Sequence, residues 1–205
     1  MELVFVTNNQ GKLREIENLL GDCFDLRSLK DIGFEGDIPE TNPTIEENAS
    51  AKSYYIYDRF GTDCFADDTG LEVESLDNRP GVLSARFAEP YKSGMSGSKD
   101  EQTEANIDKL LGLLDGKASR KARFRTVISL IIEGRETLFE GVVNGEISHK
   151  RSGEGGFGYD PVFIPEGHKQ TFAEMSLDEK NKISHRAIAF RKLVDHLTGK
   201  LYNKC

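Results

Sequence analysis

Two neighbouring carboxylates, Asp67 and Asp68, directly follow the apolar residues of a short predicted strand. Successive side chains of a strand point to opposite sides, and carboxylates this close repel each other unless a cation lies nearby. Magnesium favours oxygen ligands and is usually bound by one or two carboxylates together with substrate phosphates. The pair therefore indicates a magnesium site, to which Glu40 could add a second carboxylate. A turn with Thr69 and Gly70 at its corner is the alternative.

A polar segment lies between the first predicted strand and the helix that follows it. At such a position, free backbone N–H groups and the positive end of the helix could bind a phosphate, and Lys12 adds a full positive charge. The segment is not the common glycine-rich phosphate loop, because it has one glycine and because Leu13 follows the lysine in place of Ser or Thr. A polar turn with a solvated lysine is the alternative. The candidate residues are Thr7, Asn8, Asn9, Gln10, Gly11 and Lys12.

Glycines surround an aromatic residue in the segment 154–161, EGGFGYDP, and a second aromatic residue follows it. Glycine lets a ligand approach the backbone closely, and an aromatic ring presented there can stack on a nucleobase, which contributes about 1–3 kcal/mol. The segment therefore indicates a base-binding site, with a glycine-rich turn as the alternative. The candidate residues are Phe157, Gly158, Tyr159 and Asp160.

Three cationic or polar donors, Lys180, His185 and Arg186, gather near the start of the last predicted helix. Each can donate a hydrogen bond to a carbonyl oxygen on a base. The cap of this helix is either Ser184 or Ser176, the latter in a longer capping box. A charged, solvated helix face is the alternative interpretation of the three donors.

Hydrophobic periodicity and turn residues predict the elements that position these groups. They indicate a mixed α/β fold over one domain that spans 1–205, and the family resemblance described below implies an elongated mixed sheet flanked by helices. In the first part of the chain we expect a strand at 3–6, a helix through Leu20, a helix capped by Thr44 and ending near Phe60, and a short strand ending at Asp68. We then expect an antiparallel strand at 71–75, a helix at 103–114, paired strands at 123–132 and 137–149, and a C-terminal helix.

The chain has 205 residues and a formal net charge of −8, which argues against a nucleic-acid partner because phosphate-backbone binders display a broad basic face. The N-terminus lacks the apolar region of a signal peptide, and no uncharged apolar run approaches the length of a membrane span. We therefore expect a cytoplasmic protein without a membrane partner, in which any anionic ligand is held by local charges.

The ordered set of motifs resembles the Ham1/inosine triphosphate pyrophosphatase family over essentially the whole chain. The matching segments are Thr7-x-Asn9-x-x-Lys12, Glu47-Asn48-Ala49-x-x-Lys52, Ala66-Asp67-Asp68-Thr69-Gly70-Leu71, Pro80-Gly81-x-x-Ser84-Ala85-Arg86, Gly156-Phe157-Gly158-Tyr159-Asp160-Pro161 and Ser184-His185-Arg186. The resemblance implies two lobes with a central substrate cleft, a homodimer, and hydrolysis of ITP, dITP and XTP to the monophosphate and pyrophosphate. It also implies magnesium as the cofactor, with manganese as an alternative of the same ligand preference.

Residue roles follow from the same resemblance. Asp68 is implied as the catalytic carboxylate and a magnesium ligand, with Glu40, or Asp37 in its place, as the second ligand. Lys12 and Lys52 are implied to bind the phosphates, together with the other residues of 7–12. Thr69 is implied to touch the substrate, Phe157, Gly158, Tyr159 and Asp160 to hold the base and sugar, and Lys180, His185 and Arg186 to read the base edge.

A chemical mechanism follows from these roles. Asp68 aligns a water against the α-phosphorus, and the cations stabilise the departing pyrophosphate. Donors such as His185 and Arg186 would be satisfied by the six-carbonyl of hypoxanthine or xanthine and left unpaired by adenine. The feature that excludes GTP is not evident in the sequence. A nucleotide-sensing protein without turnover and a phosphohydrolase of other nucleotides are the alternative functions.

Overall fold

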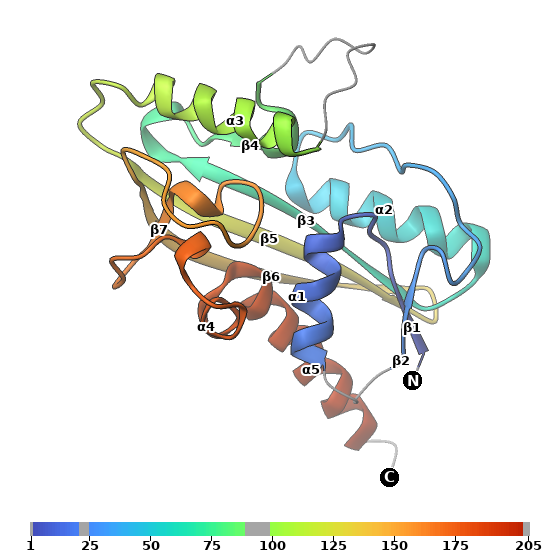
Figure 1. Cartoon of the computed structure of the whole chain (residues 1–205). Coiled ribbons are helices and arrows are strands. Elements are labelled where there is room, and N and C mark those ends of the chain that lie inside the picture. Colours follow the sequence, from blue (N-terminus) through green and yellow to red (C-terminus); the bar gives the residue numbers. More distant parts are fainter. Residues whose placement is uncertain (1, 21–24, 89–98, 203–205) are drawn as a thin grey trace. The chain divides into compact units, whose positions relative to one another are not determined.

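The computed structural model describes residues 2–20, 25–88 and 99–202, and the chain divides into two compact units. The first unit comprises residues 1–68, 126–142 and 183–205, and the second comprises residues 69–125 and 143–182. Among the described residues, the strands pair in the order β2-β1-β3-β5-β6-β7, with β4 on β3, so the predicted mixed α/β fold is confirmed (Figure 1). Strands β3 (Cys64–Val73), β5 (Lys121–Ile132) and β6 (Arg135–Ile147) contribute residues to both units.

The first unit is built on a central parallel strand, β1 (Glu2–Phe5). It pairs with β2 (Asp25–Ser28) on one side and with β3 on the other, in the register that places Val4 opposite Cys64. Parallel strands of this kind are buried on both faces and therefore need apolar residues at consecutive positions. Residues 3–6 meet this need, because all four are at most 2% exposed.

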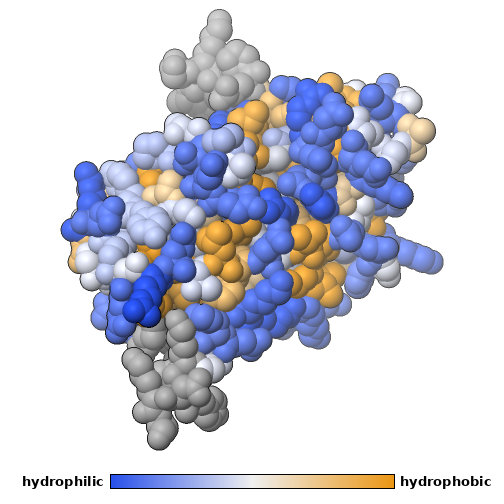
Figure 2. Space-filling model, turned by 180° about the vertical axis from the view of Figure 1, so that it is seen from behind, coloured by the Kyte–Doolittle hydropathy of each residue, from blue (hydrophilic) through white to orange (hydrophobic). Residues whose placement is uncertain are grey.

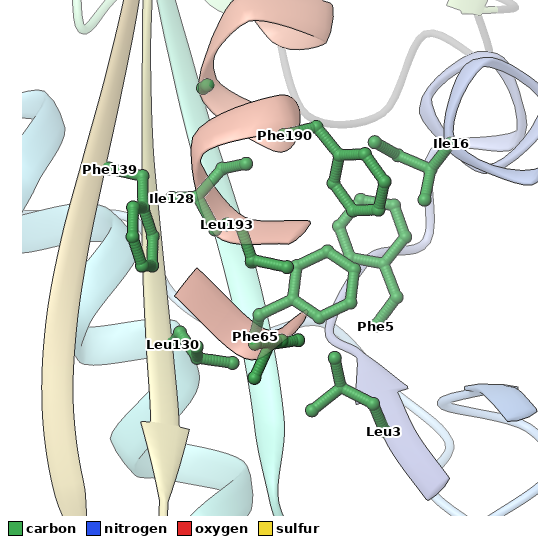
Figure 3. Packing of buried hydrophobic residues seen from close by; sticks show 11 residues of the cluster. Leu3, Phe5, Ile16, Phe65, Ile128, Leu130, Phe139, Phe190 and Leu193 are labelled. Carbon is green, nitrogen blue, oxygen red and sulfur yellow. The ribbon is translucent and has the colours of Figure 1, made fainter. Parts of the chain in front are cut away.

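One face of this sheet packs against two helices, α1 (Gln10–Leu20) and α5 (His185–Tyr202), as Figure 3 shows. Ile16 of α1 and Phe190 of α5 enclose Phe5 and Phe65, whose rings stack 4.5 Å apart. The opposite face carries the side chains of alternate strand residues, Val4, Cys64 and Ala66, and packs against α2 (Ile45–Phe60) through Ile56. In the part of β3 that belongs to the first unit, odd-numbered residues thus face α1 and α5, and even-numbered residues face α2.

The second unit is antiparallel around the continuing half of β3. β4 (Arg79–Gly81) pairs with β3, and β7 (Phe163–Pro165) pairs with β6. Phe124, Phe163 and Phe172 form an aromatic cluster with ring centroids 4.6–6.2 Å apart. The helices of this unit are α3 (Lys99–Leu113) and α4 (Leu177–Ile183), whose last residue belongs to the first unit.

The prediction of a strand that ends at Asp68 is wrong. β3 runs without a break to Val73, and the chain reverses later, where Asp77 and Asn78 adopt positive φ angles of 56° and 60°. The turn preference of Thr69 and Gly70 yields to pairing along the sheet, since Leu71 lies opposite Gly81 of β4 in the register. Residues 71–73 of the separate strand predicted at 71–75 therefore belong to β3, and a short 3-10 helix, Glu74–Leu76, follows.

The last predicted helix consists of two helices, and both candidate caps are used. Ser176 forms a capping box with Glu179 before α4, and the Ser184 hydroxyl accepts a hydrogen bond from the Ala187 N–H at the start of α5. The Thr44 cap of α2 is confirmed by the hydrogen bond from the Glu47 N–H. Local capping chemistry thus fixes three helix starts that the sequence indicates.

The surface is predominantly polar on the face drawn in Figure 2, where small patches of apolar residues interrupt hydrophilic ones. No helix in the described part of the chain has both the length and the apolar character needed to cross a membrane. Among the described residues, the large apolar side chains that remain exposed are scattered along the chain. They are Tyr54, Phe60, Leu83, Leu113, Leu138 and Leu177.

Candidate functional site

The two carboxylates of β3 lie in different surroundings because they occupy consecutive strand positions. Asp67 shares the odd-numbered face with Phe65, toward α1 and α5, and Asp68 shares the even-numbered face with Ala66, toward α2. Both are buried, at 2% and 7% exposed. We call the groups around them the Asp67 pocket and the Asp68 pocket, and both belong entirely to the first unit.

The Asp67 pocket contains two cations and two anions. Lys12 of α1 donates to Asp67 Oδ1 at 2.9 Å, and Arg186 of α5 donates from Nε to Asp67 Oδ2 at 3.1 Å. The Nη1 group of Arg186 also donates to Glu15, one turn after Lys12 on α1. Lys12, Asp67, Arg186 and Glu15 thus form a continuous buried chain of alternating charge.

This pairing controls the protonation of the Asp67 pocket. Burial alone would raise the pKa of Asp67, but Lys12 and Arg186 outweigh it and hold that pKa well below its ordinary value. Burial also lowers the pKa of Lys12, which Asp67 opposes only in part. The pKa of Arg186 is raised, because Glu15 and Asp67 outweigh the effect of its burial. Asp67 is therefore a firmly ionised carboxylate.

The Asp68 pocket is organised around one buried cation, Lys52 of α2. Its Nζ group donates to Asp68 Oδ1 at 3.1 Å, to Glu40 Oε1 at 2.5 Å and to the backbone carbonyl of Asp67 at 2.7 Å. Burial lowers the pKa of Lys52, but Asp68 and Glu40 outweigh it and raise that pKa. Burial raises the pKa of Asp68, and Glu40 adds to the shift against the opposing lysines.

The donor set of the Asp68 pocket fits a magnesium ion that is shared with a substrate. Asp68 and Glu40 both contact the Lys52 ammonium, and Asp68 is held above its ordinary pKa by burial and by Glu40. A divalent cation would stabilise the ionised forms of both carboxylates. The described residues contain no cluster of three or more His, Cys, Asp or Glu side chains suited to a metal. Magnesium commonly takes one or two protein carboxylates and completes its shell with phosphates and waters.

The segment before α2 brings Glu40, and not Asp37, to Lys52. Asn48 fastens this segment: its side chain accepts from the Asn42 N–H at 3.0 Å and donates to the Asn42 carbonyl at 3.2 Å. Asp37 is exposed, and its carboxylate lies 3.4 Å from the Asn8 amide. Of the two alternative second carboxylates, Glu40 is therefore the one that lies in the Asp68 pocket.

The phosphate segment differs from the prediction in its backbone. The Asn9 side chain caps α1, since its Oδ1 accepts from the Gly11 and Lys12 N–H groups at 2.9 and 3.3 Å, and Thr7 Oγ1 accepts from the Asn9 N–H. The expectation that these N–H groups are free for a phosphate is wrong, because side chains of the segment satisfy them first. Gln10 and Asn8 are exposed. The positive end of α1 and the Lys12 ammonium remain as the features that would attract a phosphate.

The base-binding candidates of the second unit gather around Asp160, which is 2% exposed. Asp160 Oδ2 accepts from the Phe157 N–H at 2.7 Å and from Lys180 Nζ at 2.6 Å. The Lys180 ammonium lies 5.0 Å from the centroid of the Phe157 ring. Gly156 is required here, since its φ is 73° and a Cβ atom would lie 2.1 Å from Asp160 Oδ2. The lysine and the carboxylate thus fix the orientation of a half-buried aromatic ring.

The remaining candidates vary in exposure. Tyr159 is buried, burial raises its pKa, and its hydroxyl donates to the Ser84 carbonyl at 3.0 Å, so the side chain serves packing within the second unit. Gly158 and Thr69 are partly exposed. His185 and Arg186 are only 3% and 1% exposed. The structure therefore collects Lys12, Lys52, Asp68 and Glu40 in the first unit, and Phe157, Asp160 and Lys180 in the second.

Two organising residues were not identified from the sequence as parts of the site. Glu15 is 3% exposed and lies three residues after Lys12, so helical spacing alone could have placed it on the same face. Asn48 belongs to a motif that the sequence singles out, but its contact with Asn42 depends on how the preceding segment folds back. Both act through other side chains or through the backbone.

Comparison with known proteins agrees with the fold and with these motifs. A model of the Ham1 family matches residues 3–196. The dITP/XTP pyrophosphatase of Christiangramia forsetii is 50% identical over 198 residues, covering 97% of this chain and 100% of that protein, and that of Bacillus subtilis is 44% identical over 196 residues, covering 94% of each. The solved Ham1 protein of Staphylococcus aureus is 37% identical, with a TM-score of 0.84 over 98% of this chain and 100% of that one. The chain therefore belongs to the Ham1 family.

Proposed function

We propose that this protein hydrolyses the non-canonical purine nucleoside triphosphates ITP, dITP and XTP to the nucleoside monophosphate and pyrophosphate. The names of the relatives, which are 44–50% identical over nearly their whole length, support this activity. The observation that carries the proposal is the Asp68 pocket, where the carboxylates of Asp68 and Glu40 converge on one buried lysine. Such a pocket is suited to a divalent cation that accompanies a triphosphate.

The proposed chemistry places one carboxylate at the reacting water. Magnesium held by Asp68 and Glu40 would neutralise phosphate charge and make a nearby water more acidic. Asp68 orients that water and accepts its proton. The water oxygen bonds to the α-phosphorus, the bond from that phosphorus to the bridging oxygen breaks, and pyrophosphate leaves.

The phosphate chain is assigned to the cations of the first unit. Lys12 lies at the start of α1, where the helix end is also positive, and Lys52 lies beside Asp68. These charges would attract the triphosphate and stabilise pyrophosphate as it leaves. Thr7, Asn8, Asn9, Gln10 and Gly11 would contribute to triphosphate binding, and Thr69 would contact the substrate.

The base is assigned to the residues for which the family resemblance implies this role. Phe157 would stack on the purine, with Gly158, Tyr159 and Asp160 shaping the surrounding backbone. Lys180 and His185 would donate to the six-carbonyl of hypoxanthine or xanthine, a group that adenine lacks. Arg186, which contacts Asp67 and Glu15, is assigned to the base edge on the strength of the family resemblance.

The working metal, the assembly and the compartment complete the proposal. We assign magnesium, for which manganese could substitute, and a homodimer on the strength of the family resemblance, and a cytoplasmic location from the sequence. Light scattering on the purified protein tests the dimer, and a monomer at micromolar concentration would contradict it.

The activity is tested by measuring pyrophosphate release from ITP, XTP, GTP, ATP and dTTP in parallel with magnesium. We expect release from ITP and XTP at rates at least about a hundredfold above ATP, since a site built to bond a carbonyl rejects a base without one. Equal rates on all five would overturn the base assignment. Tight ITP binding without pyrophosphate release would instead indicate a nucleotide sensor.

A further inference from the structure

Asp67 has no part in the chemistry described so far, although it is one of the most buried charged groups of the first unit, at 2% exposed. Both oxygens of its carboxylate accept hydrogen bonds from cations: Oδ1 accepts from Lys12 and Oδ2 accepts from Arg186. A carboxylate held in this way has little capacity left for a metal ion. Its position on the odd-numbered face of β3 also directs it away from α2, which carries Lys52.

Lys12 is anchored to this one residue by two contacts. Its ammonium donates to Asp67 Oδ1 at 2.9 Å and to the Asp67 backbone carbonyl at 3.3 Å. An ammonium has three donors, so these contacts fix its location and still leave capacity for a phosphate. A lysine side chain has several rotatable bonds, and without an anchor its charge would be spread over many positions.

Arg186 holds the other side of Asp67 and is itself held by Glu15. Lys12 and Glu15 both belong to α1, whereas Arg186 is the second residue of α5. The chain of contacts therefore leaves α1 at Lys12, passes through Asp67 and Arg186, and returns to α1 at Glu15. Such a closed path fixes the start of α1 against β3 and α5.

We propose that Asp67 is a positioning residue, which holds the Lys12 ammonium in place for the phosphates of the substrate. Asp67 contacts neither the metal nor the substrate. The inference rests on the proposed function only in taking the ligand to be a triphosphate, and it gives the adjacent residues Asp67 and Asp68 separate roles.

The first test compares Asp67→Asn with Glu15→Gln, a matched control. Each variant removes one buried carboxylate from the same network, but only Asp67 contacts Lys12. We expect Asp67→Asn to raise KM for ITP at least tenfold and to lower kcat less than threefold, and Glu15→Gln to change KM less than threefold. If Asp67 only repelled the substrate, its removal would lower KM, and if it only supported the fold, both variants would behave alike. Either result would overturn the proposal.

A second test keeps the proposal falsifiable if Asp67→Asn alone does not fold. The double variant Lys12→Met with Asp67→Asn leaves Arg186 paired with Glu15 and removes the unmatched ammonium. If Asp67 acts through Lys12, the double variant has the same KM as Lys12→Met alone, within a factor of two. A further fivefold change in KM would show an independent role for Asp67 and would overturn the proposal.

Binding of inorganic tripolyphosphate without metal, measured by calorimetry, separates this proposal from the proposed function. We expect wild type and Glu15→Gln to bind it with similar affinity, and Asp67→Asn and Lys12→Met to bind at least fivefold more weakly. This order of affinities does not depend on any nucleobase or on turnover. Inactivity on ITP with the expected order retained would refute the substrate assignment alone, whereas equal affinities of wild type and Asp67→Asn would refute the role of Asp67.

Discussion

The Asp67 pocket and the Asp68 pocket lie one residue apart on the same strand but differ in charge balance. In the Asp67 pocket, two carboxylates face two cations, and the pKa of Asp67 is lowered. In the Asp68 pocket, two carboxylates face one cation, and the pKa of Asp68 is raised. The ion pairs of the Asp67 pocket need no added ligand, whereas the Asp68 pocket is suited to bind a cation.

The alternation of side chains along a strand is the physical origin of this difference. Consecutive residues enter environments built by different helices, so two identical side chains acquire different chemistry without any difference in type. The backbone carbonyl of Asp67 links the two environments, since it accepts from both Lys12 and Lys52. Closely spaced carboxylates therefore have to be assigned by their neighbours and not by their spacing.

The largest expected effect is the loss of turnover in Asp68→Asn. The variant keeps the shape of the side chain but removes the group that orients water and accepts its proton, so kcat for ITP should fall by about 10²–10⁴-fold. Steady-state pyrophosphate release measures this change. Activity within tenfold of wild type would place the proton acceptor elsewhere.

Stability should be affected more by Asp67→Asn than by Asp68→Asn, the reverse of the order expected for turnover. Asp67→Asn breaks buried ion pairs and should lower the free energy of unfolding by about 3–5 kcal/mol. The folded state favours ionised Asp67, so its contribution is present at neutral pH and is lost as pH falls through the lowered pKa. Urea unfolding at pH 7 measures the change.

Asp68→Asn should leave the free energy of unfolding unchanged or raise it. The folded state disfavours ionised Asp68 above its raised pKa, and Lys52 keeps Glu40 as a partner. Equal destabilisation of the two variants would contradict the contrast between the pockets.

Removal of Glu40 should weaken metal use without abolishing chemistry. Loss of one carboxylate ligand should raise the magnesium concentration for half-maximal activity in Glu40→Gln by roughly 10–100-fold, a range seen when outer partners of metal ligands are removed. Asp37→Asn is the matched control, because Asp37 is exposed and contacts Asn8. A shift in Asp37→Asn but not in Glu40→Gln would reverse the assignment.

The smallest expected effect is stabilisation by the metal itself. At a magnesium concentration ten times the dissociation constant, the folded state should gain about 1.4 kcal/mol. Thermal unfolding with and without magnesium should show this gain in wild type and in Asp67→Asn but not in Asp68→Asn. A gain that disappears only in Asp67→Asn would place the ion in the Asp67 pocket and contradict our assignment.

Much of the fold follows from local signals in the sequence. Thr44, Ser176 and Ser184 cap helices where their positions indicate, and the paired strands predicted at 123–132 and 137–149 correspond to β5 and β6. The failure at Thr69 and Gly70 has a tertiary cause, because the pairing of β3 with β4 overrides their preference for a turn.

The candidate site is predictable only in part, for a similar reason. Motif spacing identifies Lys12, Lys52 and Asp68 as candidate charged residues of the site. It cannot show that Arg186 contacts Glu15, since 171 positions separate them in the chain and the contact requires α1 and α5 to pack on the same face. Nor can it show that Asn9 satisfies the N–H groups of its own helix before any phosphate does.

The central claim is that a water oriented by Asp68 attacks the α-phosphorus. Hydrolysis of ITP in water labelled with heavy oxygen, followed by mass spectrometry of both products, tests it most directly. We predict that the label enters the monophosphate and that the released pyrophosphate carries none. Label in the pyrophosphate would mean attack at the β-phosphorus and would contradict the account.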